Sequence, residues 1–113
     1  MDFLMVLKIV AALGTAATGL LSFLKPDAVY GFTGLTANGA RGVSEVRAVF
    51  GGLFIALGIA PLILGATAYH MLGYGYLAIA VTRTISIILD KSYAQSNFIS
   101  LAIEIVFGVI LSI

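Results

Sequence analysis

The sequence predicts an all-α integral membrane protein in which four helices form a bundle. Of its 113 residues, 61% are hydrophobic and only 10% are charged, and the mean hydropathy is +1.15. A soluble domain carries about 25% charged residues, so this chain has too few to cover a water-facing surface. Four apolar runs are each long enough to cross a hydrocarbon core, which takes about 17–25 residues of helix. These observations favour one four-span domain over residues 1–113.

Composition also excludes several classes of function. The formal net charge of +1, without a basic cluster, argues against a nucleic-acid partner. The absence of cysteine removes disulfides, thiolate metal sites and thiol catalysis. His70 is the only histidine and belongs to no metal-binding motif, so we predict no metal site, and no motif implies a cofactor.

The first span is predicted at about residues 3–24 and ends before Lys25 and Pro26. Asp2 precedes the apolar run, and no basic segment comes before it, so we expect a membrane span rather than a signal peptide. Lys8 lies about two turns into this span, from where its long side chain is expected to reach the nearer interface.

A glycine-rich loop over residues 25–44 joins the first and second spans and is too polar to cross the membrane. Its aromatic residues, Tyr30 and Phe32, predict an interfacial position, and a short helix is expected near Pro26–Tyr30. Two interpretations stay open. The loop is either a lid over a cavity or a connector anchored at the interface.

The second span, at about residues 45–66, is predicted to begin with Ser44 as its N-cap. Its small residues recur at intervals of four and of seven, which lets neighbouring backbones approach closely. With two such faces, this span is predicted to be the central helix. The predicted helix-packing residues are Ala48, Gly51, Gly52, Ala56 and Gly58.

The third and fourth spans, at about residues 69–89 and 97–113, each contain a charged residue within an apolar run. Counting outward from their connection places Arg83 and Glu104 at one level, roughly 10 Å inside the helix ends at the rise of an α-helix. An ionisable side chain at that depth costs at least ~2.5 kcal/mol unless it is partnered. We therefore expect these two residues to form an ion pair.

Topology extends this pair into a predicted polar cluster. With four spans, the first and third connections lie on the same side of the membrane, so the polar residues beside them share one leaflet. The positive-inside rule makes that side cytoplasmic and leaves both termini outside, because Lys25, Arg41 and Lys91 also lie there. The predicted cluster is Glu45, Arg47, Arg83, Asp90, Asn97 and Glu104.

Two roles for this cluster stay open. It either fixes the packing of the helices without a ligand or forms a pocket between Arg47 and Arg83 for an amphiphile such as a lipid or a quinone. The leading hypothesis is a non-enzymatic accessory or assembly subunit that packs against other membrane proteins or forms a homo-oligomer. The alternative is a binder of an amphiphilic small molecule, with an enzyme acting on it in third place. No catalytic residue is predicted, and the lipid bilayer is the one partner that composition implies.

The segment over residues 39–53 resembles small bacterial four-helix membrane proteins of unknown function, which are loosely related to the DoxX-like group. The pattern is a Glu-x-Arg-Ala followed by paired glycines, an Arg and an Asp seven residues apart, and a Glu in the last span. The resemblance implies a four-helix bundle in the bacterial inner membrane and supplies no activity. The matching residues are Glu45, Arg47, Ala48, Gly51, Gly52, Arg83, Asp90 and Glu104.

Overall fold

A computed structural model describes residues 2–113, which form helices and loops without a strand. Four helical segments are long and apolar enough to cross a membrane, so the predicted all-α membrane bundle is confirmed. The first is α1 (Phe3–Leu24), and the second is the continuous run of α3 (Gly39–Glu45), η1 (Val46–Leu53) and α4 (Phe54–Leu64). The third is α5 (Ala66–Asp90) and the fourth is α6 (Gln95–Ser112).

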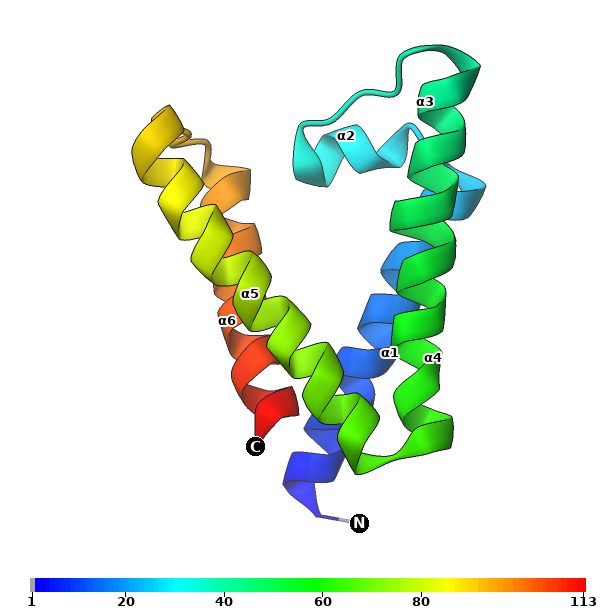
Figure 1. Cartoon of the computed structure of the whole chain (residues 1–113), viewed down its shortest axis with the longest axis vertical. Coiled ribbons are helices and arrows are strands. Elements are labelled where there is room, and N and C mark those ends of the chain that lie inside the picture. The colour runs from blue at the N-terminus through cyan, green and yellow to red at the C-terminus, as the bar shows by residue number, and fades with distance from the viewer. Residues whose placement is uncertain (1) are drawn as a thin grey trace.

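The four segments pack as two helical hairpins that form a V (Figure 1). In the N-terminal hairpin α1 lies against η1 and α4, and in the C-terminal hairpin α5 lies against α6. The hairpins meet at the end of the molecule that holds both termini and diverge at the other end. The predicted polar residues belong to the diverging end, because the second span begins there and the α5–α6 connection lies there.

Glycines let the two helices of the N-terminal hairpin touch backbone to backbone. A Cβ atom added at Gly58 would lie 2.4 Å from the Ala16 nitrogen and 2.5 Å from the Ala12 carbonyl oxygen, and one at Gly51 would lie 3.0 Å from Phe23 Cβ. Gly51 and Gly58 are therefore buried against α1, as expected of small residues at helix contacts.

The other predicted packing face of the second span differs from expectation. Ala48, Gly52 and Ala56 are exposed, because the C-terminal hairpin leans away from this helix instead of covering it. The second span therefore packs on α1 along η1 and α4, and it contacts α5 mainly through α4, where the two hairpins meet. It also contains the wide turns of a π-helix, η1, which the sequence analysis did not predict.

The helix ends are close to the predicted ones, with one clear error. The second span begins at Gly39, so Ser44 lies inside the helix and is not its N-cap. Arg41 and Glu45 form an ion pair one turn apart on this added segment, which favours the earlier start. The predicted N-terminus of α1 is supported by Asp2, whose carboxylate accepts a hydrogen bond from the Met5 amide at 2.8 Å.

The loop between the first two spans holds one short helix, α2 (Ala28–Thr33). It contacts both α1 and α6, and it lies across the open end of the V (Figure 1). Val29 of this helix is fully buried, and Gly34 ends the helix in a left-handed conformation with φ of 78°. Thus α2 joins the two hairpins where they would otherwise be apart.

Candidate functional site

The centre of the candidate site is an ion pair between α5 and α6. Arg83 donates from Nε to Glu104 Oε1 at 2.8 Å and from Nη2 to Glu104 Oε2 at 2.6 Å. This two-pronged geometry holds the guanidinium in one plane and is the strong form of the interaction. Glu104 is buried, with 7% of its surface exposed. The two side chains meet at one level, as counting along the helices indicates.

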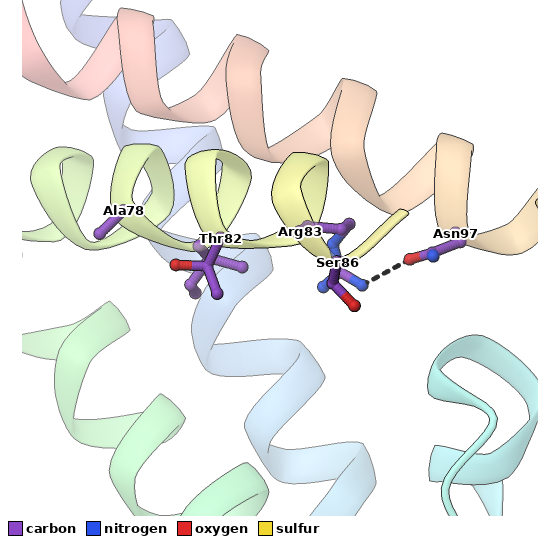
Figure 2. Close-up of a pocket in the computed structure, with 6 residues that line it drawn as sticks. Ala78, Thr82, Arg83, Ser86 and Asn97 are labelled. Atoms are coloured by element: carbon purple, nitrogen blue, oxygen red, sulfur yellow. Dashed lines mark hydrogen bonds between the residues drawn. The ribbon is translucent and has the colours of Figure 1, made fainter. Parts of the chain in front are cut away.

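Asn97 also holds the Arg83 guanidinium in place. Its Oδ1 accepts a hydrogen bond from Arg83 Nη1 at 2.8 Å (Figure 2). Its Nδ2 donates to Ser92 Oγ at 2.9 Å. Ser92 belongs to the short connection between α5 and α6, so the amide links the guanidinium to that turn. Arg83 is thus held from two sides, by Glu104 and by Asn97.

Another polar contact, separate from the ion pair, joins the N-terminal hairpin to the C-terminal hairpin. The hydroxyls of Thr15 on α1 and Tyr76 on α5 are 2.5 Å apart. Thr15 donates its single hydroxyl hydrogen to the Ala11 carbonyl oxygen at 2.8 Å, so Tyr76 is the donor between them. Tyr76 lies seven residues before Arg83 and therefore on the same face of α5, and its partner Thr15 belongs to the other hairpin.

The remaining predicted cluster residues lie elsewhere. Glu45 pairs with Arg41 on the exposed surface of the second span. Arg47 donates to the Phe23 carbonyl oxygen at 2.9 Å and lies over the Phe23 ring at 5.7 Å from its centroid. These contacts keep both side chains on the N-terminal hairpin.

The structure therefore divides the predicted cluster. Asp90 accepts a hydrogen bond from Ser86 at 2.7 Å, close to the exposed end of α5. Of the six predicted residues, three contact one another in the structure, namely Arg83, Asn97 and Glu104. The other three, Glu45, Arg47 and Asp90, have other partners. The physical reason is that the hairpins diverge at this end, which separates Glu45 and Arg47 from Arg83. Asp90 lies on the same helix as Arg83 but at its exposed end, where it bonds Ser86 one turn away.

Lys8 also differs from expectation. It belongs to the buried face of α1 and is only 7% exposed, rather than lying open at an interface. Its neighbours along that face are Ala11, Ala12 and Thr15.

An open cavity of about 400 Å³, a recess in the surface rather than an enclosed chamber, lies beside the Arg83 guanidinium. In Figure 2 the side chains of Thr82 and Ser86 point away from α6, with α1 and α4 on the far side of the space. The wall is mixed, with an apolar part on α5 and a polar part around the guanidinium. Its lining residues are Ala78, Ile79, Thr82, Arg83, Ser86 and Asn97.

Within residues 2–113, no three His, Asp or Glu side chains lie close enough together to hold a metal ion. The polar groups beside the cavity are the Arg83 guanidinium, the Asn97 amide and the Thr82 and Ser86 hydroxyls. Ser86 already donates its hydroxyl hydrogen to a carboxylate. Such groups bind and orient a molecule.

Comparison with known families places the chain. The model of the family described as a domain of unknown function, DUF4345, matches residues 3–113. The chain belongs to this family. Comparisons with curated proteins and with solved structures gave no significant match. Membership of DUF4345 thus covers all four spans and assigns no activity, and what this DUF4345 chain does must be argued from its own site.

Proposed function

We propose that this protein binds a small amphiphilic molecule from within the membrane, with the polar end of the molecule at Arg83. The observation that carries the proposal is the cavity of about 400 Å³ with a fixed guanidinium in its wall. Ligand sites for small molecules typically measure about 300–1,000 Å³ and combine an apolar wall with a few placed polar groups. Ala78 and Ile79 supply the apolar wall here.

Arg83 keeps hydrogen-bonding capacity for such a ligand. A guanidinium has five N–H donors, and the bonds to Glu104 and Asn97 use one each on Nε, Nη1 and Nη2. One donor therefore remains on each Nη atom. The side chain of Arg83 is 30% exposed, so these donors are accessible. An intramembrane ionisable group with spare donors beside a cavity is typical of a binding site.

The position of α2 supports the lid interpretation of the glycine-rich loop. This helix lies across the open end of the V and contacts α6, next to the end of the molecule that holds the cavity. A ligand in the cavity would therefore lie toward the end of the molecule that α2 crosses, against lining residues that all belong to α5 and α6.

The accessory or assembly role stays a competing prediction. Exposed apolar side chains cover the outer faces of all four spans, and they suit contact with lipid as well as contact with another subunit. Placement in a bacterial inner membrane, with both termini outside the cytoplasm and a relationship to the DoxX-like group, also stays a prediction.

Native mass spectrometry of the protein purified in mild detergent tests the proposal. We expect a discrete small mass to remain bound to the wild type and to be lost from Ala78→Phe, which fills the cavity and leaves the ion pair intact. Ala102→Phe is the matched control, since Ala102 is exposed on α6 and does not line the cavity. Equal retention in both variants would overturn the proposal. Co-migration with a larger complex, without a small mass, would favour the accessory role instead.

A further inference from the structure

The charge balance around Arg83 indicates what kind of polar end the cavity accepts. We infer that the ligand's head is a neutral hydrogen-bond acceptor, such as the oxygen of an ester, ketone or ether, and not a carboxylate or phosphate. This inference rests on the proposed function, because it concerns the same cavity.

The positive charge of the Arg83 guanidinium is neutralised within the protein. Glu104 contacts both Nε and Nη2 of Arg83 at 2.8 and 2.6 Å, so the positive charge already has its counter-ion. A second anion at the remaining donors would place two negative groups on one guanidinium in a medium of low dielectric. Like charges that share such a site repel each other strongly, so an ionised head group is disfavoured.

Another charged group near the cavity is negative, and the second cation predicted there lies elsewhere. Ser86 lines the cavity and donates its hydroxyl hydrogen to Asp90, so a further carboxylate lies just beyond the cavity wall. Arg47, the cation that the sequence analysis placed opposite Arg83, is instead held on the Phe23 carbonyl oxygen of the other hairpin. Among residues 2–113, Arg83, with Glu104 as its counter-ion, is therefore the one cation that lines the cavity.

The unused hydrogen-bonding groups that face the cavity can act as donors. The unused groups of Arg83 are N–H donors, one on each Nη atom. The Thr82 hydroxyl also lines the cavity and can rotate to donate. The cavity thus offers donors in a neutral setting, which matches a carbonyl or ether oxygen. An uncharged head group also enters from hydrocarbon without the cost of moving an ion.

The test compares two probes with the same alkyl chain, hexadecyl acetate and hexadecyl phosphate. Each is titrated into detergent-purified, delipidated protein and counted by native mass spectrometry at neutral pH, where the phosphate is ionised. We expect the wild type to bind the acetate about tenfold more tightly, a preference of about 1.4 kcal/mol. Ala78→Phe should lose the acetate, which shows that binding occurs in the cavity.

Two variants change the charge beside the cavity. Glu104→Gln leaves Arg83 without its counter-ion, so the preference should reverse in favour of the phosphate. Asp90→Asn changes only an exposed carboxylate and should reduce the preference for the acetate without reversing it; it serves if Glu104→Gln does not fold by circular dichroism. Glu45→Gln is the matched control, because it removes the same charge from the other hairpin and should leave the preference unchanged.

The outcomes separate the two proposals. If the wild type binds the phosphate at least as tightly as the acetate, and Ala78→Phe abolishes that binding, the inference is wrong and the proposed function stands. If Ala78→Phe affects neither probe, both are wrong. A reversal in Glu45→Gln equal to that in Glu104→Gln would also overturn the inference, since the effect would then come from net charge alone.

Discussion

The two hairpins of the V each contain an arginine paired with a glutamate, but they use the pair differently. In the N-terminal hairpin, Arg41 and Glu45 lie one turn apart on the same helix, with 81% and 54% of their side chains exposed. In the C-terminal hairpin, Arg83 and Glu104 join two helices, with 30% and 10% exposed. The same two residue types therefore lie exposed on one helix in the first hairpin and connect two helices in the second.

What holds the N-terminal hairpin together is instead the close approach of two backbones. A Cβ atom at Gly19 would lie 2.7 Å from the Gly51 carbonyl oxygen, and Gly58 touches α1 in the same way. Small residues of this kind are a main source of helix association in lipid. The C-terminal hairpin has such a contact too, because a Cβ atom at Gly73 would lie 2.8 Å from the Ser112 nitrogen. The comparison teaches that close backbone contact joins the helices of both hairpins and that the C-terminal hairpin adds an ion pair between its helices. Four predictions test it, starting with the largest expected effect.

Breaking the buried pair should be the most damaging change. Glu104→Leu leaves the Arg83 guanidinium without its carboxylate, and we expect the free energy of unfolding to fall by about 3–5 kcal/mol. Titration with SDS in mixed micelles, followed by circular dichroism, measures this loss. The double variant Arg83→Met/Glu104→Leu should recover most of it, because no unpaired charge is left. A loss below about 1 kcal/mol in the single variant would show that the pair does not join the helices.

Adding one methyl group at the backbone contact should come next. Gly58→Ala forces α1 and α4 apart, since the clash is with the Ala12 and Ala16 backbone and no rotamer relieves it. We expect about 1–3 kcal/mol of destabilisation in the same SDS titration. Gly52→Ala is the control on the exposed face of the same helix, where the nearest atom to an added Cβ is 3.9 Å away. Equal costs at the two glycines would contradict the comparison.

The contact between the hairpins should have an intermediate effect. Tyr76→Phe removes the hydroxyl that donates to Thr15 but keeps the ring, which packs edge-on against Phe107 at 5.5 Å. We expect a loss of about 0.5–1.5 kcal/mol, the usual net value of one hydrogen bond. Tyr74→Phe, at an exposed tyrosine, should change the unfolding midpoint much less. If both variants shift it equally, the hydroxyl does not connect the hairpins.

The exposed pair should matter least. Glu45→Gln removes the charge that faces Arg41, and an exposed pair one turn apart on a helix contributes only about 0.3–0.5 kcal/mol. High salt should weaken even this contribution, because exposed charges are screened. Unfolding titrations at low and high ionic strength check both statements. A cost close to that of Glu104→Leu would mean that the two pairs are equivalent after all.

The sequence by itself determined the class of the protein, its four spans and the meeting of Arg83 with Glu104. Hydropathy sets the spans, and the constant rise of an α-helix places two residues equally far from a short turn at the same depth. The relative depth of these two residues depends only on the α5–α6 hairpin, so it is the same for any arrangement of the other helices.

The tertiary structure alone decided which of the other polar residues are neighbours. Depth in the membrane says nothing about lateral distance, and that distance depends on the glycine contacts that pull α1 and α4 together and on the divergence of the two hairpins. Arg47 consequently lies on Phe23, and Tyr76 bonds Thr15 of the other hairpin. The contact between Asp90 and Ser86 is instead local, since the two residues are one turn apart on α5. Sequence spacing fixes the level of a side chain along its helix, whereas its partner across the bundle is fixed by how the helices pack.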